Sequence, residues 1–304
     1  MLESDLAEAR RIFCVAFGTF LGVPNPESFC ADREYVSTRW RNHPEACLVA
    51  ELDGKVVGSN LATHWGSFGF FGPLTVLPEL WGQRIAQQLL APTMDLFALW
   101  GVREAGLYTF AHSIKHVALY QKFGFWPGFL TVLMSKEAGP HGQSCVNFSA
   151  LDPPARASAE NACRRLTDSI YAGLDVSCEI RAVAEQALGE TVLLWGGDTL
   201  DGFAVCHCGE RTEAGSGNCY LKFAAVRPGP GEETALGALL EGCHALAAAR
   251  GLQRLVAGVN TGRIRAYREM LRLGFRTDSQ GVAMHRPHPG AYNRPDVFIL
   301  DDWR

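Results

Sequence analysis

The second half of this chain repeats the first in one register, and this repeat restricts the folds open to it. Adding 150 to a residue number aligns the halves without a gap from Leu74 onward. Turn residues and apolar residues stay in step, as in the pairs Val76 and Val226, Pro78 and Pro228, Leu89-Leu90 and Leu239-Leu240, Gly101 and Gly251, and Gly124-Phe125 and Gly274-Phe275. This agreement indicates an internal duplication, and a length of 304 residues suits two domains of ordinary size.

The boundary between the two repeats is expected in a polar, turn-rich region. Gly139-Pro140 and Asp152-Pro153-Pro154 interrupt regular structure there. We therefore expect one domain over residues 1–140 and a second over residues 155–304. In both, strand-like runs and helical patterns occur together, which predicts an α/β fold.

Residues 72–91 predict a strand, a tight loop and the start of a helix. Leu74-Thr75-Val76 is a strand-like run, and Pro78 cannot continue a sheet ladder. After Trp81-Gly82, apolar residues return at helical spacing, at Ile85, Ala86, Leu89 and Leu90. The first turn of a helix has free N–H groups and partial positive charge, so this segment is expected to bind a phosphate group.

The same stretch resembles the acyl-CoA signature of the GNAT N-acetyltransferase superfamily. That signature is a strand, then Val-x-Pro-x-x, then Arg/Gln-x-x-Gly-x-Gly/Ala at the start of a long helix. The residues in register with it are Val76, Pro78, Gly82, Ile85 and Ala86. Two positions depart from the pattern. Trp81 stands at the Arg/Gln position, and Arg84 stands at the central glycine, where it supplies a cation.

A second resemblance follows one helix and one strand later. The family segment Asn-x-x-Ala-x-x-Leu-Tyr-x-Lys-x-Gly-Phe is matched by Leu119-Tyr120, Lys122 and Gly124-Phe125, with Ser113 in place of Asn and His116 in place of Ala. Two motifs in the family's order are far more specific than one. The resemblance covers most of residues 5–135. With the repeat, it implies two GNAT-like domains, each a mixed, mostly antiparallel sheet flanked by helices.

This resemblance implies that the chain uses acetyl-CoA as its acyl donor. The cofactor-binding residues that it implies are Leu74, Thr75, Val76, Trp81, Gly82, Gln83, Arg84, Ile85, Ala86 and Ser113. Leu74 and Val76 would pair with the pantetheine arm through their backbones. Residues 81–86 would hold the pyrophosphate.

Acetyl transfer to an amine needs a neutral amine, a polarised thioester carbonyl and a proton for the departing thiolate. Tyr120 is the predicted acid, because a phenol with an ordinary pKa of about 10 stays protonated at neutral pH. As the base we favour His112, at the end of the strand before the Tyr120 helix. His64, His116 and a chain of water molecules are the alternatives.

The second repeat differs where the chemistry would take place. At the phosphate loop it has Pro228-Gly229-Pro230-Gly231-Glu232-Glu233, and its two carboxylates would repel a pyrophosphate. Met270 stands at the position of Tyr120 and cannot transfer a proton. We therefore predict catalysis in the first domain only. The C-terminal residues 292–304 are expected to complete a sheet of the second half or to cover the first.

Composition limits the expected partners and compartment. A net charge of −4 and a pI near 6.1 argue against a nucleic acid or an acidic membrane as the main partner. The sequence shows no long apolar run and no basic leader, and its ten cysteines include no Cys-x-x-Cys pair. We expect reduced cysteines, no metal, a cytoplasmic location, and a monomer or homodimer.

These features together predict an N-acetyltransferase that moves an acetyl group from acetyl-CoA to a primary amine by direct attack. A small-molecule amine is the favoured acceptor. A protein terminus or a lysine side chain is a further acceptor class, which would need an open groove. The alternative function is a non-catalytic acyl-CoA sensor or scaffold, which the non-family residues Trp81 and Arg84 leave open.

Overall fold

The computed structural model describes residues 1–139, 145–288 and 290–304, so Pro140 of the predicted linker lies outside the described residues. The first half contains α1 (Leu6–Phe20), α2 (Val36–Asn42), β1 (Cys47–Leu52), β2 (Lys55–Trp65), β3 (Phe68–Phe71), β4 (Thr75–Val76), α3 (Ile85–Leu99), β5 (Glu104–Thr109), α4 (Ile114–Gln121) and β6 (Trp126–Glu137). The second half contains β7 (Val146–Asn147), α5 (Pro153–Ile170), α6 (Ser177–Glu185), β8 (Gly189–Gly196), β9 (Thr199–Cys208), β10 (Asn218–Val226), α7 (Glu232–Ala249), β11 (Arg254–Asn260), α8 (Ile264–Arg272), β12 (Arg276–Arg286) and β13 (Ile299–Leu300).

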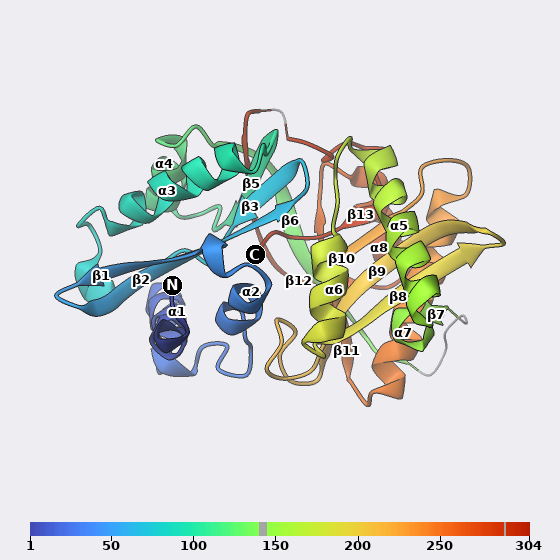
Figure 1. The fold of residues 1–304 in the computed structure, drawn as a ribbon, viewed down its shortest axis with the longest axis horizontal. Helices are drawn as coiled ribbons and strands as arrows, with labels where there is room; N and C mark the ends of the chain where they lie inside the picture. Colours follow the sequence, from blue (N-terminus) through green and yellow to red (C-terminus); the bar gives the residue numbers. More distant parts are fainter. Residues whose placement is uncertain (140–144, 289) are drawn as a thin grey trace.

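The strands of the described residues form one continuous sheet with the order β1-β2-β3-β5-β12-β6-β11-β10-β9-β8-β7. In addition, β4 pairs with β2 and β13 pairs with β10. The pairs β3–β5 and β10–β11 are parallel, and the other pairs in these ranges are antiparallel. Helices of the first half lie at the left of Figure 1 and those of the second half at the right. The predicted α/β fold, with a mostly antiparallel sheet flanked by helices, is confirmed.

The order of elements in the second half repeats that of the first. Apart from β7 and β13, which belong to the second half alone, each half has two helices, then antiparallel strands, and then helix, strand, helix and strand in turn. The elements β5, α4 and β6 begin at residues 104, 114 and 126, and β11, α8 and β12 begin at residues 254, 264 and 276. Because each start is shifted by 150 residues, this regularity supports the proposed duplication.

The two halves exchange a strand at the centre of the sheet. From the second half, β12 pairs with β5 along Val282–Arg286. From the first half, β6 pairs with β11 along Thr131–Glu137, and β6 and β12 pair with each other. Figure 1 shows β6 (green) and β12 (red) in the middle of the molecule. Hydrogen bonds therefore cross the boundary between residues 1–140 and 155–304, which itself stays a prediction.

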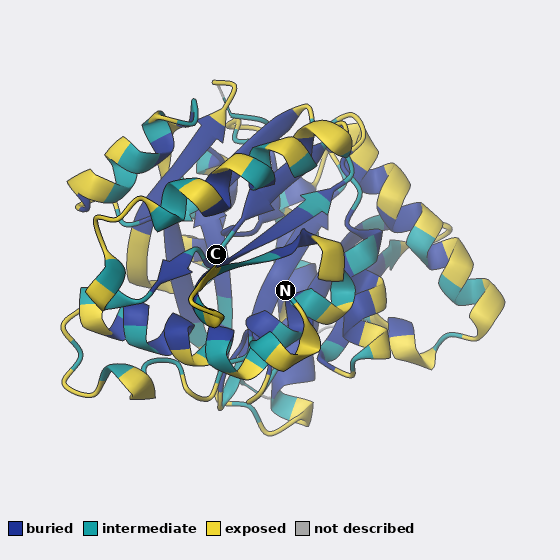
Figure 2. Ribbon diagram, turned by 60° about the vertical axis from the view of Figure 1, so that its left-hand side comes forward, coloured by how far each residue is buried: buried dark blue, intermediate teal, exposed yellow. Residues whose placement is uncertain are grey.

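One apolar core also joins the halves. Trp65 of β2 packs with Phe70 of β3 at a ring-centroid distance of 4.7 Å and with Phe223 of β10 at 5.2 Å. Figure 2 shows buried strands beneath helices whose outer faces are exposed. Phe68, Phe70 and Phe71 of β3 are all buried. This shared packing fixes the position of one half against the other.

The cysteines are all free thiols, and none of them is exposed. Within the described ranges, no group of three or more His, Cys, Asp and Glu side chains is placed to hold a metal ion. None of the helices described has the length and apolar character that crossing a membrane demands.

Candidate active site

The strands β4 and β5 diverge, and this divergence positions the site. Phe68–Phe70 of β3 pair in parallel with Glu104–Gly106 of β5. The chain then turns away at Gly72, whose φ of 145° lies in the region that favours glycine. Beyond this turn β4 pairs with β2, close to Gly58, where a Cβ would lie only 2.7 Å from the Thr75 carbonyl oxygen. The other edge of β4 has no strand partner among the described residues.

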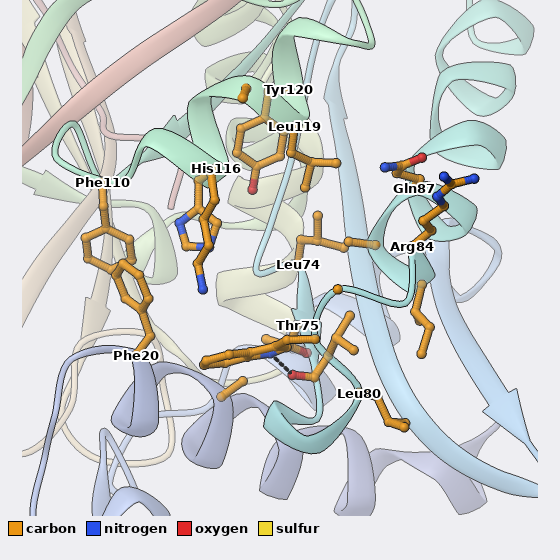
Figure 3. Close-up of a pocket in the computed structure, with 18 of the residues that line it drawn as sticks. Phe20, Leu74, Thr75, Leu80, Arg84, Gln87, Phe110, His116, Leu119 and Tyr120 are labelled. Atoms are coloured by element: carbon orange, nitrogen blue, oxygen red, sulfur yellow. Dashed lines mark hydrogen bonds between the residues drawn. The ribbon is translucent and has the colours of Figure 1, made fainter.

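A cavity of about 450 Å³ lies along this free edge. Eight of the predicted cofactor-binding residues line it: Leu74, Thr75, Val76, Trp81, Gly82, Arg84, Ile85 and Ala86. Figure 3 shows Leu74 and Thr75 on one side, Arg84 and Gln87 at the start of α3, and Phe20, Phe110, His116 and Tyr120 around the rest. The other two predicted residues are not part of this wall. Gln83 is exposed in the loop, and Ser113 is buried before α4.

The loop before α3 has the conformation of an anion-binding turn. Arg84, at the position of the family's central glycine, takes the left-handed conformation with a φ of 65°, and Gly82 has a φ of 86°. A non-glycine residue in this conformation costs about 1–2 kcal/mol, so the loop keeps the backbone shape despite the substitution. Among the described residues, the amides of Gly82 and Arg84 donate no backbone hydrogen bond, and those of Ile85 and Ala86 open the helix. An anion bound at this loop would meet these N–H groups and the partial positive charge of the helix N-terminus.

Trp81 forms part of the cavity wall. Its indole Nε1 donates a 2.8 Å hydrogen bond to the Val76 carbonyl, drawn as a dashed line in Figure 3. The Lys115 ammonium lies 4.3 Å from the centroid of the Trp81 ring. Trp81, at the family's Arg/Gln position, thus holds Lys115 of α4 near the loop as a second cation beside Arg84. Sequence reasoning did not identify Lys115 as a residue of the site. The signal available was that Arg265, its equivalent in the second repeat, is also a cation.

Tyr120 is buried in α4, and its hydroxyl points into the cavity in Figure 3. Burial raises the pKa of Tyr120 to about 12, and a hydrogen bond with the Thr109 side chain opposes that shift. The phenol is therefore protonated at every physiological pH and can donate a proton or a hydrogen bond. Thr109, at the end of β5, is a contact that the sequence motifs did not identify.

The structure does not bring His112 to Tyr120. His112 is exposed, it stacks on Phe20 at a centroid distance of 6.0 Å, and it does not line the cavity. His64 lies elsewhere, between His43 at 5.2 Å and Trp100 at 4.6 Å. Neither of these histidines is placed to contact a group bound beside Tyr120.

His116 is the histidine that does line the cavity, one helical turn before Tyr120. Burial and the neighbouring Lys115 lower the pKa of His116 to about 4, so its imidazole is neutral at pH 7. Its Nδ1 has no hydrogen-bond partner among the described residues. A neutral imidazole with a free nitrogen is able to accept a proton, although a pKa this low makes it a weak base.

A second cavity, of about 490 Å³, adjoins the first. The two share Phe17, Leu74, Phe110, His116 and Tyr120 in their walls. The second cavity extends away from α3 and is closed by residues of the second half, including Arg254 and Trp303. Tyr120 therefore stands where two spaces meet, one along β4 and one between the halves.

In the second half, the position that corresponds to the first cavity is filled by the chain itself. Ala224 and Val226 are the repeat equivalents of Leu74 and Val76. Ala224 pairs with Leu300 of β13, and the Val226 amide donates a 3.0 Å hydrogen bond to the Phe298 carbonyl. The C-terminal segment thus completes the sheet of the second half, one of the two positions predicted for it.

The corresponding loop of the second half is also filled. The Glu232 carboxylate accepts a 3.0 Å hydrogen bond from the Gly229 amide. Arg265 lies 2.9 Å from Glu232 and 2.5 Å from Glu233. An internal carboxylate therefore occupies the region where an external anion would bind, as the sequence difference between the halves suggested.

Comparison with known proteins bears directly on this arrangement. Residues 8–125 match the model of the Acetyltransferase (GNAT) family. No curated protein sequence matches the chain.

Solved structures share the fold over nearly the whole length. A candidate acetyltransferase from Pyrococcus horikoshii superposes with a TM-score of 0.66 at 13% identity, covering 97% of this chain and 90% of the other. A GCN5-related N-acetyltransferase from Sphaerobacter thermophilus gives a TM-score of 0.60 at 14% identity, with 98% and 95% covered. One from Anabaena variabilis gives 0.53 at 13% identity, with 94% and 71% covered. Residues 8–125 therefore match the Acetyltransferase (GNAT) family, and the chain as a whole shares its fold with solved GCN5-related N-acetyltransferases.

Proposed function

We propose that the first half transfers an acetyl group from acetyl-CoA to a primary amine, by direct attack of the amine on the thioester. The observation that carries this proposal is the meeting of two cavities at the Tyr120 hydroxyl. The cavity along β4 has the features that an acyl-CoA requires, and the other offers a separate space for an acceptor. Bound acetyl-CoA would supply the activated acetyl group.

The residues of the first cavity fit such a donor. The free amides of Gly82, Arg84, Ile85 and Ala86, with the Arg84 side chain, would form a cradle for a pyrophosphate. The unpaired edge of β4 offers backbone groups to the amides of a pantetheine arm, as one more strand would. Lys115 and Lys122 add positive charge to the same wall.

Tyr120 holds the proton that the departing thiolate needs. Its raised pKa keeps the proton on the phenol until a strong base forms beside it. The acceptor amine must lose a proton, and the structure offers the neutral His116 and water for that step. We propose His116 rather than His112 in this role, because only His116 lines the space beside Tyr120.

A calorimetric titration with acetyl-CoA tests the donor site. We expect Arg84→Glu to weaken binding by about tenfold or more, because a carboxylate replaces a cation beside the phosphates. Arg41→Glu makes the same charge change on the exposed side of α2, outside both cavities, and is the matched control. If both variants bind acetyl-CoA equally well, the donor site is not at Arg84. If the wild type does not bind acetyl-CoA, the proposal is wrong.

The alternative, a non-catalytic acyl-CoA sensor or scaffold, shares the donor site. It differs in the role of the Tyr120 hydroxyl, which a sensor does not need. Acetyl transfer that disappears in Tyr120→Phe, with acetyl-CoA binding retained, favours the enzyme. Binding without transfer to any amine in a broad screen favours the sensor.

A further inference from the structure

The second cavity carries information about the chemical class of the acceptor, provided that the proposed acetyl transfer takes place at Tyr120. Its walls near Tyr120 are apolar, with Phe71, Leu107 and Phe110 from the first half and Trp303 from the second. Its charged side chains are Arg33, Arg254, Asp278 and Arg304. An acceptor in this space would therefore contact an apolar surface and a set of charges.

Two of the three arginines have an acidic partner. Arg254 Nη2 lies 2.9 Å from both carboxylate oxygens of Asp278 and donates to each of them. Arg304 Nε lies 3.2 Å from Asp302 Oδ1. Each of these pairs is neutral as a whole, so neither adds net charge to the cavity.

Arg33 differs from these two arginines. Within the described residues it forms no ion pair, and its guanidinium passes along the loop of the second half at Gly215, where a Cβ would lie 3.0 Å from Arg33 Nε. Tyr35 supplies no compensating negative charge, because burial raises the pKa of its phenol. Asp32 Oδ2 lies near the same Gly215 position, but within the described residues no carboxylate contacts the Arg33 guanidinium directly.

Arg304 lines the same cavity as Arg33 and is held in place by its neighbours. Its guanidinium carbon lies 4.4 Å from the centroid of the Tyr220 ring, and Tyr220 in turn donates a 2.9 Å hydrogen bond to Asp302. Its backbone carbonyl accepts a hydrogen bond from Arg39. A guanidinium held in this way loses little conformational freedom when it binds a ligand.

We infer that the acceptor amine also carries a carboxylate, which binds Arg33 with Arg304 beside it, while the apolar body of the acceptor packs on Phe71 and Trp303. A guanidinium without a carboxylate in direct contact can take one from a ligand, and it matches the planar carboxylate with two parallel hydrogen bonds. The acceptor class is thus an amino acid or a related amino carboxylate with an apolar side chain.

A pair of probes without an amine tests the carboxylate contact independently of turnover. The probes are 3-phenylpropanoate and 3-phenylpropanamide, which have nearly the same shape but differ in charge. By calorimetry we expect the carboxylate to bind the wild type about tenfold more tightly than the amide, and Arg33→Gln to abolish the difference. Arg41→Gln is the matched control and should behave like the wild type.

Equal binding of the two probes, binding of neither, or a preference unchanged in Arg33→Gln would overturn the inference. Acetyl-CoA binding is measured on the same proteins. If the wild type binds acetyl-CoA normally but neither probe, the acceptor inference is wrong and the donor site stands. If the wild type binds the carboxylate but not acetyl-CoA, the proposed function is wrong and the carboxylate site stands. With a working enzyme, L-phenylalanine should exceed L-phenylalaninamide in kcat/KM by a similar factor, and Arg33→Gln should remove that preference.

Discussion

Replacing Glu213 with glutamine tests how the two halves are held together at the site. Its carboxylate accepts two 2.8 Å hydrogen bonds from Arg39 of α2 and one of 2.8 Å from Lys222 of β10. The three side chains are only 2%, 6% and 3% exposed, in the order Glu213, Arg39 and Lys222. Arg39 also donates a 2.5 Å hydrogen bond to the Gly72 carbonyl, at the turn that separates β4 from β5.

The expected loss of stability follows from the burial of these charges. Glutamine keeps the size of Glu213 but removes the negative charge that both ion pairs share, and it leaves two buried cations without that partner. Breaking a buried ion pair in this way costs roughly 3–5 kcal/mol. For a chain of 304 residues the entropy of unfolding is about 0.6 kcal/mol/K, so Tm should fall by roughly 5–8 °C.

The pH dependence gives this prediction a second signature. Burial would raise the pKa of Glu213, but Arg39 and Lys222 hold it well below its ordinary value of 4.5. A carboxylate with a depressed pKa stabilises the fold fully above its unfolded pKa, and this contribution is lost as the pH falls toward the folded pKa. The difference in stability between wild type and Glu213→Gln should therefore be constant from pH 6 to 8 and shrink below pH 4.5.

Thermal unfolding followed by circular dichroism at pH 7 provides the measurement. Glu210→Gln is the control, because Glu210 lies three residues away, is exposed, and forms no ion pair within the described residues. If Glu213→Gln unfolds within about 1 °C of the control, the two cations are not effectively buried and the reasoning is refuted.

Three further predictions concern catalysis, stoichiometry and pH. Tyr120→Phe should lower kcat by roughly 10²-fold or more while acetyl-CoA binding is unchanged. Thiol release measures kcat, and calorimetry measures binding. An unchanged kcat would exclude Tyr120 as the acid. Calorimetry should give one acetyl-CoA per chain, because β13 and Glu232 fill the corresponding region of the second half, and a value of two would contradict this. Burial lowers the pKa values of His116, His207 and His285 to about 4 each, so these side chains take up protons on unfolding below pH 6.5. The free energy of unfolding should therefore decline as the pH falls from 6.5 toward 4. A urea midpoint that stays constant from pH 7 to 5 would disprove this pH dependence.

Local signals in the sequence correctly predicted the strand, loop and helix of residues 72–91. Pro78 and Gly82 mark the end of a strand and a tight turn, and the helical period begins directly after them. These signals depend only on residues close together in the chain, so they remain readable although Arg84 stands where the family has glycine. The backbone there keeps a glycine-like conformation that only the structure could reveal.

The choice between His112 and His116 depended on helix phase. His116 lies four residues before Tyr120, so both point to the same side of α4, whereas His112 precedes the helix. The sequence already placed His116 on the Tyr120 helix, but only the structure shows which histidine lines the cavity.

The second cavity was beyond sequence reasoning for a different reason. Arg33 and Arg304 lie at opposite ends of the chain, and they line one space only because the sheet brings the halves together. Contacts between residues so far apart have no local pattern. The pairing of β12 with β5 was unpredictable on the same ground.

The exchange of β6 and β12 also limits how such a chain can evolve. A repeat that no longer binds a ligand is usually free to be deleted or to become a separate gene. Here deletion of residues after 155 would remove β12 and leave β5 with an open edge, which is a site for aggregation. The same cut would leave β6 without β11. The integrity of the first repeat therefore depends on the second, whatever the second repeat binds.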